Sequence, residues 1–167
     1  RVATDDVVRT TLGFLADRVA TRVRAKGLAG RTVTVRVRFP ALRSVTRSRT
    51  LERPISTTRT LAEVAEGLVA AALAGEVGTR EVTLWAISVS GLTPDTDRQL
   101  ELPLGLEGEH LRPGSSTGVE RSKVDDAVDG VRARFGREAL GYARVALRSG
   151  GGVPDGFREL AEADDRR

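Results

Sequence analysis

The stretch RSVTRSRTL, residues 43–51, interleaves arginines with serines and threonines. A guanidinium group offers several donors in a fixed fork and a hydroxyl offers one, so both kinds of side chain bind phosphate oxygens well. The alternation is that of a β-strand, yet the segment is too polar to be buried on both sides. Its residue types and spacing therefore indicate an exposed strand that binds a polyanion.

The distribution of charge supports this interpretation. Residues 1–91 carry 15 Lys or Arg against 8 Asp or Glu, a balance of +7, whereas residues 92–167 carry 12 against 15, a balance of −3. A localised basic stripe is typical of proteins that bind nucleic acid. The simpler alternative is a solvated surface in a chain that prefers arginine. Between residues 27 and 60, only Glu52 opposes Arg31, Arg36, Arg38, Arg43, Arg47, Arg49, Arg53 and Arg59.

A second candidate site is QLELPL, residues 99–104. An extended segment of this kind can insert leucines into an apolar pocket of a partner. The proline disfavours a helix and keeps the segment extended. The alternative is a leucine-rich linker that folds back on its own domain. We expect a protein partner to be bound by Gln99, Leu100, Leu102, Pro103 and Leu104.

No set of residues indicates catalysis. The single histidine, His110, lies in a predicted linker, and the chain has no cysteine that could act as a thiol nucleophile or metal ligand. Asp125 and Asp126 are adjacent on a predicted helix and point in different directions, which makes a poor two-metal site. No glycine-rich phosphate loop is present. We therefore predict no catalytic residue, metal site or cofactor in this chain.

The elements that position these side chains follow from the spacing of apolar residues. Residues 7–26 have helical spacing, with Asp5 or Asp6 as the cap and Gly27 at the end. A second helix is expected to begin at a capping box, Thr60-x-x-Glu63, and to end near Gly75.

Strands are predicted at residues 31–39, 43–51 and 81–90, with Pro54 breaking the ladder after the second. A short extended piece at residues 1–4 would add a fourth. The order β-α-β-β-α-β predicts an α+β fold, in which two helices cover one face of a four-stranded antiparallel sheet.

The other face of this sheet would be open. It would present Thr32, Thr34, Arg36, Arg38, Ser88 and Ser90. The face of strand 43–51 is left undecided, because one parity exposes Ser44, Thr46, Ser48 and Thr50 and the other exposes Arg47 and Arg49. No aromatic residue lies on this face, which favours contact with a duplex backbone over base stacking. An ordinary polar sheet face is the alternative.

The chain divides by composition into a domain at 1–91, a linker at 92–121, a C-terminal segment at 122–147 and a disordered tail at 148–167. In the C-terminal segment, Ser122-x-x-Asp125 is expected to open a short helix that ends at Gly136, and residues 141–147 to form a strand. The helix places Val124, Val128, Val131 and Phe135 in line. Because the sequence has no Met, no signal peptide and no long apolar run, we expect a cytoplasmic piece of a longer protein with no membrane contact.

A family resemblance rests on LADRVATRVRAKGLAGRTVTVRVRF, SVTRSRTL and EVTLWAISVSGL followed by QLELPL, which cover about residues 1–104. Together they resemble the little finger, or polymerase-associated, domain of Y-family translesion DNA polymerases, most closely of the DNA polymerase IV branch. VDDAVDGVRARFG followed by ARVAL resembles a C-terminal extension of many bacterial members. Ala86 stands where glycine is usual, and Thr83 stands where a basic residue is common.

The resemblance implies a four-stranded sheet backed by two helices, whose open face grips both strands of primer–template DNA. QLELPL is similar to the peptide that binds the beta sliding clamp. The other implied partners are the palm, fingers and thumb of the polymerase, where two Mg²⁺ ions would act. A module that binds an acidic protein is the main alternative. By position, the implied DNA-binding residues are Arg36, Arg38, Thr46, Arg47, Ser48, Arg49, Thr50, Ser88 and Ser90.

Overall fold

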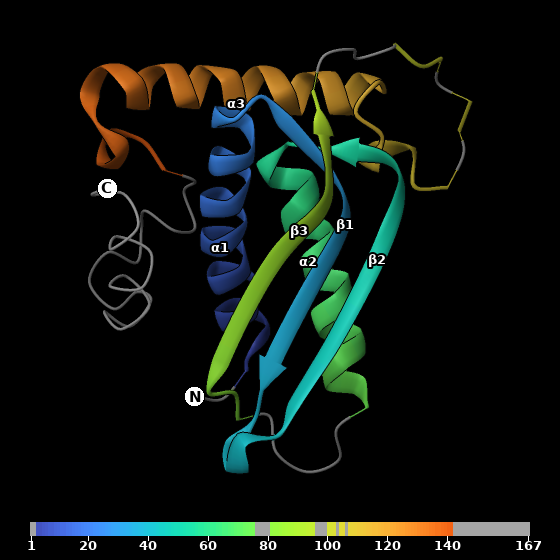
Figure 1. Cartoon of the computed structure of the whole chain (residues 1–167), viewed down its shortest axis with the longest axis vertical. Coiled ribbons are helices and arrows are strands. Elements are labelled where there is room, and N and C mark those ends of the chain that lie inside the picture. Colours follow the sequence, from blue (N-terminus) through green and yellow to red (C-terminus); the bar gives the residue numbers. More distant parts are fainter. Residues whose placement is uncertain (1–2, 76–80, 96–99, 103, 106, 142–167) are drawn as a thin grey trace.

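The structure, a computed structural model, describes residues 3–75, 81–95, 100–102, 104–105 and 107–141. One antiparallel sheet has the strand order β2-β1-β3, and α1 and α2 lie side by side on one of its faces (Figure 1). A third helix crosses the ends of these two helices (Figure 1). The elements are α1 (Asp5–Ala25), β1 (Leu28–Arg38), β2 (Ser44–Ile55), α2 (Thr58–Ala74), β3 (Leu84–Pro94) and α3 (Ser116–Phe135).

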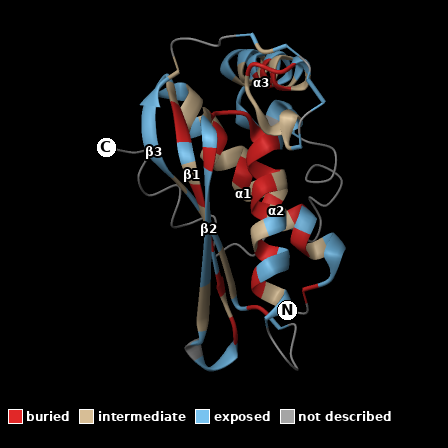
Figure 2. Cartoon of the chain, turned by 90° about the vertical axis from the view of Figure 1, so that its right-hand side faces the viewer, coloured by how far each residue is buried: buried red, intermediate tan, exposed pale blue. Residues whose placement is uncertain are grey.

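The core lies between the sheet and the helix pair (Figure 2). Alternate residues of β1 point into it, as the sequence predicts: Val33, Val35 and Val37 are almost completely buried. Phe39, just after the strand, is buried to the same degree. The α+β class and the two helices on one face are thus confirmed.

The fourth strand is not confirmed. Ala3 lies in no strand, Thr4 already serves as the N-cap of α1, and residues 1–2 lie outside the described part of the chain. The strand predicted at 141–147 and the tail from 148 also fall outside it, apart from residue 141, which is in no strand.

The prediction that Pro54 breaks the ladder is confirmed, although β2 itself continues to Ile55. The pairing with β1 jumps from Thr32 opposite Thr50 to Gly30 opposite Ile55. The residues between form an irregularity in β2, where a proline need not donate a hydrogen bond to its neighbour. Pro54 therefore lies in a part of β2 that is not paired in the ladder with β1.

The helix ends were predicted better than the helix starts. Gly27 follows α1 with φ +63°, a left-handed conformation that suits glycine, and α2 ends at Gly75. The cap of α1, however, is Thr4, whose hydroxyl accepts from the Val7 amide, and not Asp5 or Asp6. The two aspartates lie in the first turn, where their negative charges interact favourably with the helix dipole.

The predicted first residues of two further helices were also wrong. The α2 helix begins at Thr58 with Thr57 as N-cap, so Thr60 lies inside the helix and the predicted capping box does not form. The α3 helix begins at Ser116, where the Ser115 hydroxyl accepts from the Gly118 amide at 3.0 Å, and not at Ser122. The N-cap residue is a Thr in one helix and a Ser in the other, two of the residue types that favour this position.

Candidate nucleic-acid and partner-binding surfaces

The sheet face that faces away from the helices is lined by hydroxyls. Cross-strand partners share a face, so the register aligns Thr50, Thr32 and Ser90 in one row and Ser48, Thr34 and Ser88 in the next. The Thr32 and Thr50 hydroxyl oxygens lie 3.0 Å apart, which confirms that both side chains point the same way. The parity left undecided by the sequence is therefore settled in favour of Ser44, Thr46, Ser48 and Thr50.

Guanidinium groups extend this face toward the β1–β2 connection. Arg36 lies between Thr46 and Ala86, and Arg38 lies between Ser44 and Leu84. Arg36 and Ala86 are both exposed. Strands lie about 4.8 Å apart and alternate residues about 7 Å, so four rows on three strands span roughly 10 by 20 Å. This patch, which we call the open face, holds donors only of the hydroxyl and guanidinium types in these rows.

Arg47 and Arg49 do not lie on the open face. They pair with Val35 and Val33, whose side chains point toward the helices. Both arginines are nevertheless exposed, because β2 is an edge strand. Long arginine stems can curl around such an edge, which would bring the two guanidinium groups beside the open face.

In the segment 99–104, the described leucines point into solvent. Leu100, Leu102 and Leu104 are 74%, 81% and 70% exposed. Gln99 and Pro103 lie outside the described residues. Glu101 points the other way: its amide donates to the Gly114 carbonyl at 2.8 Å, and its carboxylate accepts from Arg112 at 3.4 Å. The leucines do not fold back on the domain, contrary to the linker alternative.

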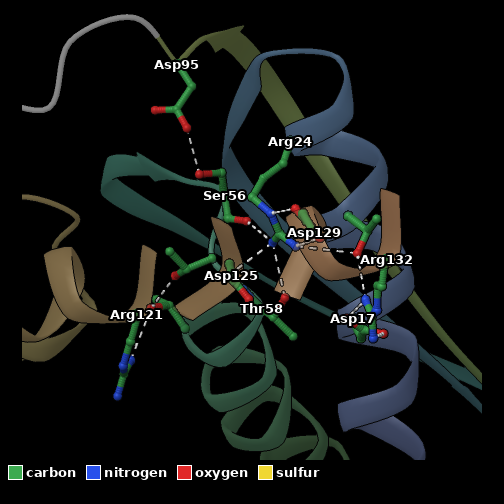
Figure 3. Close-up of polar contacts among 12 residues, drawn as sticks. Asp17, Arg24, Ser56, Thr58, Asp95, Arg121, Asp125, Asp129 and Arg132 are labelled. Atoms are coloured by element: carbon green, nitrogen blue, oxygen red, sulfur yellow. Dashed lines mark hydrogen bonds and ion pairs between the residues drawn. The ribbon is translucent and has the colours of Figure 1, made fainter. Parts of the chain in front are cut away.

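Sequence reasoning missed an ionic cluster that attaches α3 to the domain (Figure 3). Arg24 of α1 donates from Nε to Asp129 Oδ2 at 2.7 Å and from Nη1 to Asp125 Oδ2 at 3.2 Å. The same Asp125 oxygen accepts from the Thr58 amide at 2.8 Å. Since Thr57 makes no capping hydrogen bond of its own, α2 is capped by a carboxylate from another helix.

Two further arginines, both in α3, complete the attachment of this helix to the domain. Arg132 binds both carboxylate oxygens of Asp17 at 2.8 and 3.0 Å. Arg121 binds Glu63 at 2.8 and 2.9 Å and the Thr60 hydroxyl at 3.1 Å. The partners are 58 to 115 residues apart in the chain, so no local pattern could have shown them.

The apolar stripe predicted for α3 is not buried as a whole, since Val128 and Val131 are only half-buried. Val124 is 53% and Phe135 66% exposed, while the buried residues of the helix are Gly118, Ser122 and Asp125. Residues 116–135 are thus held to the domain mainly by charge pairs and hydrogen bonds.

No catalytic arrangement is visible in the described part of the chain. His110 is mostly exposed, and its Nε2 atom lies 4.0 Å from a Glu63 oxygen. The described residues contain no cluster of three or more His, Asp or Glu side chains that could hold a metal ion. Among the helices described, none has both the length and the apolar character needed to cross a bilayer.

Comparison with known proteins agrees with this geometry. The model of the impB/mucB/samB family C-terminal domain matches residues 1–102. The chain is 54% identical over 158 residues to DNA polymerase IV 2 of Mesorhizobium japonicum, covering 95% of this chain and 38% of that protein. It is 43% identical over 91 residues to DNA polymerase IV of Alkalilimnicola ehrlichii, covering 53% and 24%. The chain therefore spans well under half the length of these curated relatives.

These matches place the chain in the impB/mucB/samB family, of which it carries the C-terminal domain. More narrowly, its sequence is that of the C-terminal region of a Y-family polymerase of the DNA polymerase IV type. The resemblance noted in the sequence is thereby confirmed.

Proposed function

We propose that this chain is the DNA-gripping and clamp-binding region of a lesion-bypass DNA polymerase. The observation that carries the proposal is the register of the sheet, which gathers hydroxyl and guanidinium donors on one uncovered face. Its relatives are named DNA polymerase IV, which supports DNA as the ligand. The division into domains at residues 91 and 121, and a cytoplasmic location, remain predictions.

The open face suits the backbone of a duplex. Hydroxyls and guanidinium groups are the usual donors to phosphate oxygens, and such contacts fix position without reading sequence. A patch about 10 Å wide is comparable to the major groove of B-DNA, about 12 Å. Arg47 and Arg49 at the sheet edge would reach phosphate groups of the DNA backbone beside the open face. The groups proposed to touch primer–template DNA are Arg36, Arg38, Thr46, Arg47, Ser48, Arg49, Thr50, Ser88 and Ser90.

The segment 99–104 suits a sliding clamp. Leu100, Leu102 and Leu104 are exposed at alternate positions, ready to enter an apolar pocket. In this proposal Gln99 hydrogen-bonds at the pocket rim and Pro103 keeps the peptide extended. A ring around DNA would then hold the open face near its duplex, because tethering raises the effective concentration.

The remaining partners would belong to the whole polymerase. A palm domain with its carboxylates would hold the two Mg²⁺ ions that act in nucleotide transfer, and fingers and thumb would surround the substrate. This chain would contribute grip and tethering, with no step of the chemistry assigned to its own residues.

Titrations of the chain with a primer–template duplex and with a beta sliding clamp, each at two salt concentrations, test the proposal. DNA binding is expected to weaken steeply with salt because phosphate contacts release counterions. Gln99→Ala with Leu102→Ala is expected to abolish clamp binding and leave DNA binding unchanged. Tight binding to an acidic protein with none to DNA would favour the alternative, an interaction module. Equal loss of both activities in the double variant would count against separate sites.

A further inference from the structure

We infer that Arg112 and Glu101 are positioning residues that direct Leu100 and Leu102 of the clamp-binding segment away from the domain. This inference rests on the proposed clamp binding of residues 99–104. It concerns two side chains that need not touch the clamp.

The direction of the segment is set at Glu101. Its amide donates a hydrogen bond to the Gly114 carbonyl, and its carboxylate forms an ion pair with Arg112, so residue 101 faces the domain. Neighbours along an extended chain point to opposite sides, and Leu100 and Leu102 accordingly face solvent. The contacts of Glu101 therefore constrain the direction of the two leucines beside it.

Arg112 is itself fixed by a second carboxylate. Its Nη2 atom lies 2.7 Å from Glu52, a residue of β2. Glu52 is the single acidic residue in the arginine-rich stretch from 27 to 60, and the structure uses it to hold Arg112. The guanidinium therefore connects the sheet to the leucine segment.

The backbone on which Arg112 sits is attached to α3. The Ser115 hydroxyl and amide both donate to the Arg112 carbonyl, at 2.8 and 3.2 Å. A Cβ atom at Gly118 would lie 2.2 Å from that same carbonyl oxygen, which shows how closely the first turn of α3 covers it. Leu111, just before, packs against the core between the helices and the sheet.

The chain is also fixed where it leaves the sheet. The Asp95 amide donates to the Gly27 carbonyl at 2.9 Å, and its carboxylate accepts from the Ser56 hydroxyl at 2.7 Å. The clamp-binding residues thus lie between two attached points, at Asp95 and Arg112. A ligand held in its bound conformation loses less entropy on binding, so this attachment should strengthen clamp affinity.

The experiment compares clamp affinity of the full chain with that of a synthetic peptide of residues 97–106. In the full chain, Arg112→Gln and Glu101→Ala should each weaken binding by about two- to fivefold, and the double variant no further, because both remove one constraint. In the peptide, Glu101→Ala should change nothing. Glu120→Gln, an exposed change on α3, is the control.

Hydrogen exchange supplies a readout that does not depend on the clamp. The Glu101 amide should be protected in the wild type and lose protection in Arg112→Gln, with an unchanged melting temperature. Unaltered clamp affinity and protection in Arg112→Gln would overturn the inference. An equal loss from Glu101→Ala in the peptide would show that Glu101 contacts the clamp directly and would also overturn it. If Leu102→Ala keeps full clamp affinity, the proposed clamp site itself is wrong.

Discussion

Replacing Asp125 by alanine tests whether the ionic cluster makes α3 part of the folded domain. The carboxylate is 1% exposed, binds Arg24, whose side chain is 8% exposed, and caps α2 through the Thr58 amide. Breaking a buried pair by removing one partner costs about 3–5 kcal/mol, and losing a helix cap costs about 0.5–2 kcal/mol. Arg24 keeps Asp129 as a partner, so we expect a loss of about 3 kcal/mol in the free energy of unfolding, at the low end of this range.

Urea denaturation of the full chain is the assay, and Asp126→Ala is the matched control. Asp126 is the next residue on the same helix and is exposed, so its removal should change stability by no more than about 0.5 kcal/mol. Asp125→Asn, which keeps an acceptor for the Thr58 amide, should fall between the two. A lowered midpoint with an unchanged slope is expected if α3 unfolds with the rest. Equal midpoints for the alanine variants at 125 and 126 would refute the reasoning.

Three further outcomes are expected. Gly118→Ala should destabilise the start of α3 and displace residues 112–113, because the new Cβ would lie 2.2 Å from the Arg112 carbonyl oxygen. Melting followed by circular dichroism and titration with the clamp would detect these changes. A melting temperature and clamp affinity equal to those of the wild type would contradict the close packing at Gly118. Phe39→Ala should cost about 3–5 kcal/mol in urea denaturation, since the ring is 1% exposed; a loss below about 1 kcal/mol would be inconsistent with a core position. Leu104→Ala should weaken clamp binding without changing the melting temperature, because the side chain is 70% exposed; a large drop in melting temperature would mean that it packs on the domain.

Strand β1 was predictable because its two faces differ strongly in polarity. Val33, Val35 and Val37 alternate with polar residues, so only one register buries them. Strand β2 gave no such signal between Thr46 and Thr50, where both faces are polar. Its parity follows only from pairing with β1, which no local pattern contains.

The role of α3 was hidden for a different reason. Periodicity finds apolar faces, but this helix docks through Asp125, Asp129 and their distant arginine partners, while Val124 stays exposed. Considered alone, Asp125 offered only a poor metal ligand. Its role as a cap for α2 depends on Thr58, which is far away in the sequence but lies beside it in the structure.

The central claim is that the open face binds the DNA backbone, and the salt dependence of duplex affinity tests it most directly. Each phosphate contact contributes about 0.9 to the slope of log affinity against log salt. Arg36→Gln with Arg38→Gln should therefore make the slope shallower by about 1.8, while Arg9→Gln, an exposed change on α1, should leave it unaltered. Equal slopes for the double variant and the wild type, or an equal effect of Arg9→Gln, would contradict the account.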